Sequence, residues 1–514
     1  MKYTVTPLPG WEHLSADDEI QVARHYRVPV AGGDVLLLPH GRPGWLRLPL
    51  PGCALLDALH GTNIAALTAW PDFAAAADTV RALYDAGLLF IGGRTGLRGV
   101  PSQRDGESSE PPTALLLKLT GSCDMACDYC YDYDERRWPG RMSSELARQL
   151  IRECLQPGHR LMLMFHGGEP MLRFRQIRDL VEFARAQADH VGAAVRFTIQ
   201  TNGLHLDERT IDFLRTHDFS VGVSLDGPRD VHDRHRVDHG GAGTFDRIAA
   251  TIDRFPEFMR REVGYISVVG TDTTSDQLER TWTFFRELGV LSWKLLPADA
   301  EGRADGTPET QNFRTLFVDF LAARLAEVLD GASEPPYITN LVQLIEPFLS
   351  LDRPNMCMKM PCGASTDLLV LDAVGAVRAC DCTYHPAFQL LPPGRTALSL
   401  SGAEAAAPET GLTARSRNSP SAAALREREG WLLNDAPCAS CPWLHQCAGT
   451  CPARALINKG SLFAVDDLEC ATRLALFPRI LADVSRPGSA LREYYRRARQ
   501  RAGAVLDASA APPR

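Results

Sequence analysis

The sequence of 514 residues lacks the features that would place the protein in a membrane or outside the cell. No apolar run is long enough to cross a bilayer, and the N-terminal residues lack the apolar core of a signal peptide. Basic residues are in the minority, with 55 Lys and Arg against 63 Asp and Glu and a formal net charge of −8. Because nucleic acids are bound through clustered basic residues, this balance indicates no nucleic-acid partner. We expect a cytoplasmic protein with no membrane partner.

Cysteine, in contrast, is abundant. The chain has 14 cysteines, and all but two lie within residues 123–130 or residues 357–470. Disulfides explain them poorly, because the cytosol keeps thiols reduced. Cys53 and Cys154 lie apart, in sequences typical of helices, and we interpret them as packing residues. The clustering of the others indicates metal or iron–sulfur sites.

The first cysteine group has the spacing CxxxCxxC, formed by Cys123, Cys127 and Cys130. A [4Fe–4S] cluster normally takes four cysteines, so three leave one iron open to another ligand. The spacing, with the aromatic Tyr129 before the last cysteine, resembles the radical SAM superfamily, whose open iron chelates S-adenosylmethionine. On the residues alone, a zinc site or three buried thiols are the alternatives.

A chain of this length should contain more than one domain. Residues 113–345 alternate short apolar runs with amphipathic helices, which predicts an α/β fold with a parallel sheet. About six such units would form the partial (β/α)6 TIM-like barrel of the radical SAM superfamily. The expected strands are Leu115–Leu119, Leu161–Phe165, Val195–Ile199, Phe219–Val223, Tyr265–Val269 and Ser292–Leu296. The expected helices between them are Ser143–Leu155, Arg175–Ala188, Asp207–Thr216, Phe245–Arg254 and Ser275–Leu288.

Polar and glycine-containing motifs follow several of these strands, where the active sites of such barrels gather. A Gly-Gly-Glu motif after the second strand resembles one in the family whose glycines allow the cofactor to approach and whose glutamate accepts from its ammonium group. The third and fourth strands end in hydroxyl and amide groups, although such sequences are also common turns. The resemblance implies that S-adenosylmethionine is bound by Tyr129, Gly167, Gly168, Glu169, Thr201, Asn202, Ser224 and Val268.

Three histidines after the fourth strand, His232, His235 and His239, suggest a metal site at first sight. Because Arg234 and Arg236 lie among them, we reject that interpretation and expect these residues to line the barrel rim or to bind peptide.

Residues 346–485 contain a more specific pattern. Its seven cysteines reproduce the spacing of the SPASM domain, which carries two auxiliary [4Fe–4S] clusters, so the resemblance implies three clusters in total. It assigns Cys362, Cys380 and Cys451 to the first auxiliary cluster and Cys438, Cys441, Cys447 and Cys470 to the second. Cys357 either completes the first cluster or is absent from it, and Cys382 has no place in the pattern. A zinc ribbon is the alternative.

Asp381 directly follows Cys380. This region resembles the anaerobic sulfatase-maturating enzymes, in which an aspartate at the matching position is the general base. The resemblance implies that Asp381 is catalytic, and a solvent-facing carboxylate is the alternative.

Residues 1–95 are expected to form a separate domain. Apolar runs at residues 35–38 and 45–48 predict a hairpin, and helices are expected at Cys53–Leu59, Ile64–Trp70 and Phe73–Ala86. A hairpin beside three short helices is a winged-helix arrangement that resembles the PqqD-like RiPP recognition element, which binds leader peptides at a sheet edge. DNA binding is the alternative, but the segment lacks a dense basic helix.

The remaining segments are connections. Residues 96–112 are expected to be a polar linker, residues 389–427 a mobile insertion rich in small residues, and residues 486–514 a basic helix followed by a tail.

Together the resemblances imply a radical SAM/SPASM maturase of ribosomally made peptides (RiPPs). It would use S-adenosylmethionine and three [4Fe–4S] clusters, abstract a hydrogen atom with a 5′-deoxyadenosyl radical and form a C–C or C–S crosslink. The implied partners are a precursor peptide and a reducing flavodoxin or ferredoxin. A formylglycine-forming or small-molecule radical SAM dehydrogenase, and an iron–sulfur DNA-binding regulator, remain alternatives.

Overall fold

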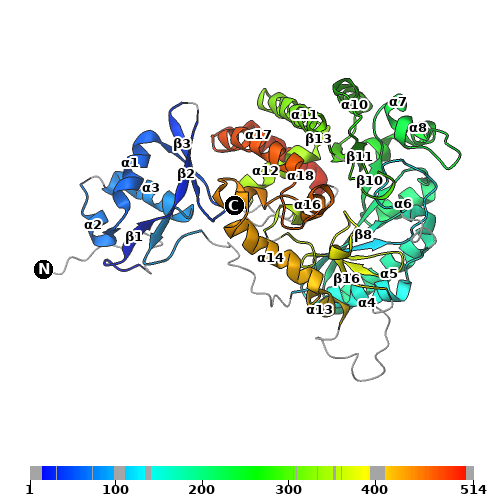
Figure 1. The fold of residues 1–514 in the computed structure, drawn as a ribbon, viewed down its shortest axis with the longest axis horizontal. Coiled ribbons are helices and arrows are strands. Elements are labelled where there is room, and N and C mark those ends of the chain that lie inside the picture. The colour runs from blue at the N-terminus through cyan, green and yellow to red at the C-terminus, as the bar shows by residue number, and fades with distance from the viewer. Residues whose placement is uncertain are drawn as a thin grey trace.

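The structure is a computed structural model that describes residues 14–30, 32–71, 73–97, 110–133, 140–304, 306–307, 309–332, 334–350, 355–360, 362–393 and 411–504. Figure 1 shows an N-terminal unit at one end of the molecule, a sheet surrounded by helices at the other, and C-terminal helices between them. Most of the expected linker over residues 96–112 lies outside the described residues.

A ten-stranded sheet forms the centre of the larger part, in the order β13-β12-β11-β10-β9-β8-β7-β14-β15-β16. Its strands β7 to β12 run parallel and neighbour one another in chain order, which confirms the α/β prediction and the six expected strands. They are β7 (Ala114–Lys118), β8 (Arg160–His166), β9 (Ala194–Thr201), β10 (Ser220–Ser224), β11 (Val263–Val269) and β12 (Ser292–Pro297).

The expected helices follow these strands and lie on the outer side of the sheet (Figure 1). They are α4 (Ser144–Cys154), α5 (Phe174–Val191), α6 (Glu208–Thr216), α8 (Phe245–Arg254) and α10 (Ser275–Leu288), with the short α7 (Arg229–His235) and α9 (Pro256–Arg261) between them. Local sequence explains their ends. Asp207 and Thr274 each form a capping box at a helix start, and Gly289 ends α10 in the left-handed conformation.

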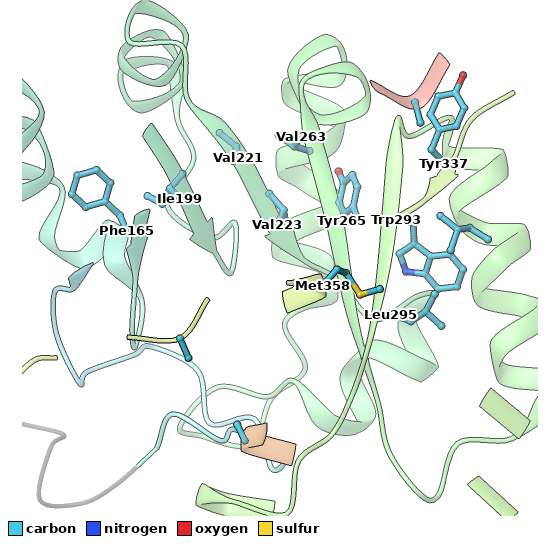
Figure 2. Close-up of a cluster of buried hydrophobic side chains, with 14 of the residues drawn as sticks. Phe165, Ile199, Val221, Val223, Val263, Tyr265, Trp293, Leu295, Tyr337 and Met358 are labelled. Atoms are coloured by element: carbon cyan, nitrogen blue, oxygen red, sulfur yellow. The ribbon is translucent and has the colours of Figure 1, made fainter. Parts of the chain in front are cut away.

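The core of this part is built from apolar side chains of successive strands. Phe165, Ile199, Val223, Tyr265 and Trp293 are at most 2% exposed. Figure 2 shows them projecting from neighbouring strands into one cluster. Because burying a large apolar side chain contributes about 1.5–3 kcal/mol, this cluster fixes the strand order and so the positions of the loops at the strand ends.

The C-terminal segment continues the same sheet. β14 (Leu368–Leu371) pairs in parallel with β7, and β15 (Val377–Arg378) and β16 (Gln389–Leu391) extend it in antiparallel fashion. At the opposite edge, β13 (Tyr337–Ile338) pairs with β12. The expected boundary at residue 345 falls inside α12 (Thr339–Leu349). The C-terminal segment is therefore joined to the barrel by main-chain hydrogen bonds.

The prediction of a mobile loop over residues 389–427 does not hold for the described residues of this range, which form regular secondary structure. These residues contain β16, α13 (Leu412–Arg417) and the start of α14 (Pro420–Asn434). Ser419 caps α14 by accepting from the amide of Ala422, and Leu412 is buried, so local capping and packing outweigh the small-residue composition. Residues 394–410 lie outside the described part.

The remaining helices lie against the open side of the barrel (Figure 1). They are α11 (Gln311–Leu329), α15 (Leu444–Cys447), α16 (Pro452–Lys459), α17 (Asp467–Val484) and α18 (Ala490–Ala504). α18 confirms the expected C-terminal helix. No helix in the described part of the chain combines the length and apolarity that a membrane span requires.

The described residues of the N-terminal unit form two three-stranded sheets and three helices. One sheet has the order β5-β1-β6 and the other β2-β3-β4. The expected hairpin is confirmed as β3–β4, whereas β2 was not expected. The strands are β1 (Glu19–Val22), β2 (His25–Pro29), β3 (Asp34–Pro39), β4 (Leu46–Pro49), β5 (Thr62–Asn63) and β6 (Leu89–Ile91). The helices are α1 (Leu50–Leu59), α2 (Ile64–Thr68) and α3 (Phe73–Asp85), as expected.

The N-terminal unit packs against the C-terminal segment. The indole of Trp45 donates to the carbonyl of Phe348 at 3.1 Å, and Gln446 donates to the carbonyl of Pro43 at 2.9 Å. Leu36 belongs to the same apolar core as the barrel. These contacts place the β3–β4 hairpin beside the C-terminal segment that carries the cysteines of residues 357–470.

Candidate active site at the carboxyl ends of the strands

The loop that carries Cys123, Cys127 and Cys130 follows β7. The chain after α7 holds it from one side. The amide of Ala126 donates to Val237 O at 2.7 Å, and Met125 forms an isolated β-bridge with Asp238. The amide of Met125 points at Cys123 Sγ, 3.4 Å away. Burial raises the pKa of Cys123, and this hydrogen bond opposes the shift by favouring the thiolate, which is the form that binds iron.

A turn after β12 holds the loop from the other side. Arg303 donates its amide to Cys130 O at 3.0 Å and its guanidinium to Cys127 O at 3.2 Å. Gly302 has φ +68°, and a Cβ there would lie 2.3 Å from Cys130 O. Only glycine fits this close approach.

Two of the three histidines after the fourth strand contact this loop. His235 pairs with Asp128 at 2.9 Å, and His239 contacts Cys123 O at 2.8 Å. His232 is buried against Thr244. Sequence reasoning had missed this supporting role, for which the only signal was the spacing of histidines after a strand end.

Glu169 lies at the centre of the predicted cofactor residues. Its buried carboxylate accepts from Thr201 Oγ1 at 2.7 Å, from the amide of Asn202 at 2.7 Å and from the amide of Met171 at 2.9 Å. Burial raises the pKa of Glu169 to about 7, although these hydrogen bonds oppose the shift. A ligand ammonium beside it would favour the charged form.

Asn202 connects Glu169 to the cysteine loop. Its side-chain amide donates to Asp124 Oδ1 at 2.7 Å and lies 4.0 Å from Cys123 Sγ. Ser224, on the neighbouring strand, accepts from Gln200 at 3.1 Å. Several of the residues expected to bind the cofactor therefore also form hydrogen bonds with one another.

The two glycines of the Gly-Gly-Glu motif approach the protein chain itself. A Cβ at Gly168 would lie 2.2 Å from Ser122 O, and one at Gly167 would lie 2.5 Å from the Lys118 side chain. The amide of Gly168 donates to Asp132 at 2.8 Å. These contacts alone require both glycines.

Tyr129 belongs to a buried group that sequence reasoning had not found. Its hydroxyl donates to Asp226, which also pairs with Arg236 at 3.0 Å and accepts from the amide of Val268 at 2.9 Å. The two remaining predicted residues, Tyr129 and Val268, therefore meet through one carboxylate. The only feature of the sequence that pointed to this group was the Asp-Gly turn after the fourth strand, which contains Asp226.

Asp381 reaches the same end of the barrel from the C-terminal segment. The ammonium of Lys118, at the end of β7, lies 2.9 Å from Asp381 Oδ1 and 2.6 Å from Asp132 Oδ1. Tyr131 donates to Asp381 Oδ2 at 3.0 Å, and Tyr384 donates to Asp132 Oδ1 at 2.5 Å. A lysine that is 1% exposed thus bridges two carboxylates from distant parts of the chain.

The charges around Asp381 keep it ionised. Burial opposes its ionisation, but the charges of Lys118 and His166 outweigh this effect and lower the pKa of Asp381 to about 2. The alternative interpretation, a solvent-facing carboxylate, does not match this position, because Asp381 lies among buried polar side chains at the barrel mouth.

The C-terminal cysteines divide into two groups by their electrostatic contacts. Cys357, Cys362, Cys380 and Cys451 interact with one another or through Cys382. The other group consists of Cys438, Cys441, Cys447 and Cys470. Burial, followed by neighbouring thiolates, raises the pKa of Cys438 to about 12. The two groups contain the same residues as the two ligand sets that the sequence pattern implied, and Cys382 lies with the first. The clusters themselves stay a prediction.

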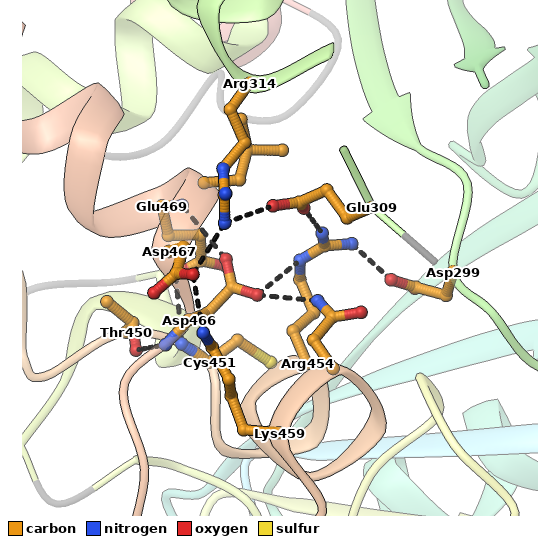
Figure 3. A network of polar contacts seen from close by, with 12 residues as sticks. Asp299, Glu309, Arg314, Thr450, Cys451, Arg454, Lys459, Asp466, Asp467 and Glu469 are labelled. Carbon is orange, nitrogen blue, oxygen red and sulfur yellow. Dashed lines mark hydrogen bonds and ion pairs between the residues drawn. The ribbon is translucent and has the colours of Figure 1, made fainter. Parts of the chain in front are cut away.

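A polar network joins this segment to the barrel, as Figure 3 shows. Arg454 on α16 pairs with Glu309 at 2.9 Å and also with Asp299, which follows β12. Glu469 on α17 accepts from the amide of Cys451 at 2.9 Å. The network fixes Cys451 relative to the end of β12.

Residues 117–285 match the radical SAM superfamily. The chain contains a radical SAM domain. Over 185 residues the chain is 29% identical to a cysteine-type anaerobic sulfatase-maturating enzyme of Clostridium perfringens, covering 34% of this chain and 49%, about half, of that enzyme. It is 29% identical over 286 residues to the mycofactocin maturase of Mycolicibacterium smegmatis, covering 54% of this chain and 67% of the relative.

Solved structures share the fold of the radical SAM domain and its surroundings. A structure titled anSMEcpe with bound AdoMet matches with a TM-score of 0.58 at 20% identity and covers 72% of this chain and 98% of its own. Streptococcus suis SuiB bound to precursor peptide SuiA matches with a TM-score of 0.50 at 15% identity and covers 89% of this chain and 99% of its own. The 89% of this chain that matches SuiB is more than residues 96–514 alone could supply. The match therefore extends into the N-terminal unit.

The radical SAM domain implies a [4Fe–4S] cluster and S-adenosylmethionine, and the residues at the barrel mouth fit both. Three thiols share one loop with an amide aimed at sulfur, and a buried carboxylate lies beside them. Among the described residues, no three Cys, His, Asp or Glu side chains converge on a point that would hold a single metal ion. A four-iron cluster spreads its cysteines over four metal atoms and does not need such convergence.

Proposed function

We propose that the protein is a radical SAM enzyme that modifies a ribosomally made precursor peptide. One observation carries the proposal: the cysteine loop, the Gly-Gly-Glu motif and Asp381 lie together at the carboxyl ends of the strands of a radical SAM domain. The peptide-maturing relatives and the likeness to the SuiB fold, which extends into the N-terminal unit, support it.

The chain's own residues would prepare the reaction. Cys123, Cys127 and Cys130 would hold the radical SAM cluster, and Glu169 would bind the ammonium of S-adenosylmethionine in a buried site. When bound and reduced, these cofactors supply a 5′-deoxyadenosyl radical that takes a hydrogen atom from the peptide. Burial of the site keeps water away from that radical.

The C-terminal segment would complete the reaction. Forming a C–C or C–S crosslink after hydrogen abstraction releases one proton and one electron. Asp381 would accept the proton at its carboxylate. The neighbouring cysteines would hold an auxiliary cluster, whose chemistry would provide for the electron. A flavodoxin or ferredoxin would supply the electron that starts each cycle.

The N-terminal unit would bind the leader of the precursor. The strand β2 lies at the edge of its sheet, and a cleft of about 660 Å³ lies beside it, lined by Arg24, Tyr26, Leu56, Asp57 and His60 among others. An extended peptide can pair with such an edge while its side chains enter the cleft. Binding the leader there raises the local concentration of the core peptide.

A sulfatase-maturating reaction is the second candidate. The identity to the Clostridium perfringens enzyme and the carboxylate next to Cys380 favour it. That reaction would not require the N-terminal unit. Its substrate would be a cysteine or serine within a protein, and its product an aldehyde in place of a crosslink.

Incubation of the reconstituted enzyme with candidate peptides tests the two functions. Any short peptide encoded next to the gene, as the candidate precursor, and a sulfatase-derived cysteine peptide should be supplied separately, with S-adenosylmethionine and a reductant. A mass decrease of the precursor with a crosslink located by fragmentation supports the proposal. Conversion of the sulfatase peptide alone would support the second candidate. Absence of S-adenosylmethionine cleavage with either peptide would contradict both.

A further inference from the structure

The helix α17 lies between the two cysteine groups of the C-terminal segment. Cys470 belongs to the second group and lies near the start of this helix. Glu469, its neighbour, accepts from the amide of Cys451, which belongs to the first group. Arg473 follows four residues after Glu469 and three after Cys470, so it lies on the same helix face as both.

The guanidinium of Arg473 is buried and directed at sulfur. It donates to Cys447 Sγ at 3.3 Å and lies 3.7 Å from Met358 Sδ, while Glu469 pairs with it at 2.8 Å. It also interacts electrostatically with Cys451 and Cys357. One fixed positive charge therefore lies between the two cysteine groups.

A second buried arginine in this segment shows the contrast. Arg454 forms ion pairs with the carboxylates of Asp299, Glu309 and Asp466 (Figure 3). Such pairing is what a buried guanidinium needs for stability. Arg473 has one carboxylate partner and directs its other donors at sulfur atoms, which are weak acceptors, so packing alone gives a poor account of it.

We propose that Arg473 is a positioning residue that raises the reduction potential of the second auxiliary cluster through its hydrogen bond to Cys447. The inference rests on the proposed function in taking these cysteines as cluster ligands. Reduction adds negative charge to a cluster, and a cation or a hydrogen bond to a ligand sulfur stabilises that charge. Because arginine does not lose its proton in proteins, the effect is permanent.

Redox titration of the reconstituted enzyme, followed by electron paramagnetic resonance, tests the inference. Iron and sulfide are counted in each variant. Arg473→Gln should retain the iron of the wild type and shift the potential of one auxiliary cluster to a more negative value. Arg473→Lys, which keeps the charge but not the forked donors, should shift it less in the same direction. Arg479→Gln, on the same helix but exposed and bonded to Ala322 O, should have no effect.

The outcomes separate this inference from the proposed function. Unchanged potentials in Arg473→Gln with full iron content would overturn the role of Arg473 alone. If Arg473→Gln loses iron, Arg473→Lys decides: a more negative potential supports the inference and an unchanged one overturns it. A wild type that holds iron for only one cluster would contradict the assignment of auxiliary clusters itself, and the inference with it.

Discussion

Lys118 and Asp381 form an ion pair of 2.9 Å between the end of the first barrel strand and the residue that follows Cys380. The pair joins the loop of the radical SAM cysteines to the C-terminal cysteine segment, because Lys118 also pairs with Asp132, two residues after Cys130. Both contacts are largely shielded from water. The position of the proposed base is therefore set by a residue of the barrel.

Replacement of Lys118 by Met should leave two carboxylates buried without a cation. We expect this change to lower the free energy of unfolding by about 3–5 kcal/mol, since breaking a buried pair leaves an uncompensated charge. The double variant Lys118→Met/Asp381→Asn should recover part of that loss. Denaturant unfolding of the four proteins in the cycle measures the coupling. Additive losses would show that the two side chains do not interact.

Asp381→Asn should still form 5′-deoxyadenosine but should form at least about 100-fold less product, because a general base contributes about 10²–10⁴ to the rate. The ratio of product to 5′-deoxyadenosine measures this uncoupling. Iron content provides the control, since Asp381 lies next to Cys380. Full product yield with intact clusters would show that this carboxylate has no part in the chemistry.

Affinity for S-adenosylmethionine should rise with pH through about 7. The pKa of Glu169 is raised to about 7 by burial, so the carboxylate that binds an ammonium is increasingly protonated below that pH. As the pH falls below 7, the weakening of binding should approach about tenfold per pH unit, which corresponds to 1.36 kcal/mol. Glu169→Gln should bind more weakly and lose this dependence. Equilibrium dialysis from pH 6 to 8.5 measures both, and an identical profile in the variant would exclude Glu169.

Replacement of Cys123, Cys127 and Cys130 by Ala should abolish formation of 5′-deoxyadenosine and remove about one third of the iron, because the other proposed ligands lie elsewhere in the chain. Cys154→Ala is the matched control, since Cys154 is buried on α4 away from both groups. Cleavage that persists in the triple variant would refute the ligand assignment.

Deletion of residues 1–95 should weaken precursor binding far more than cofactor cleavage measured without peptide. Because the deletion also removes the contact of Trp45 with Phe348, a point variant is needed. Arg24→Glu, in the cleft beside β2, should raise the dissociation constant of the leader by about tenfold or more without changing that contact. Equal affinities in all three proteins would exclude leader binding by this unit. Binding of DNA by the full-length protein without binding of the leader peptide would favour the alternative of a DNA-binding regulator.

The sequence predicted the elements that depend on local patterns. The apolar run at Leu115–Leu119 and its successors identified the six parallel strands, and the amphipathic segments between them identified the helices. Contacts between residues that are distant in the sequence could not be predicted, because no local pattern pairs β14 with β7 or brings Asp381 to Lys118. These depend on which apolar faces pack together.

The candidate site divides in the same way. The cysteine spacings and the Gly-Gly-Glu motif identified residues that lie together at the strand ends. The partners of those residues were missed, because a lysine at the end of an apolar strand or a histidine in a loop has many ordinary roles. Asp226, which joins Tyr129, Arg236 and Val268, gave no more signal than a common turn.

The pairing of β14 with β7 bears on how the chain is synthesised. Until residues 368–371 have emerged, β7 has a partner on one side only, and a row of unpaired amide and carbonyl groups in a strand of buried residues remains open. Such an edge promotes self-association. A chain cut at residue 345 should therefore aggregate, and the full-length protein should gain solubility late in translation, when the C-terminal segment closes over the first strand.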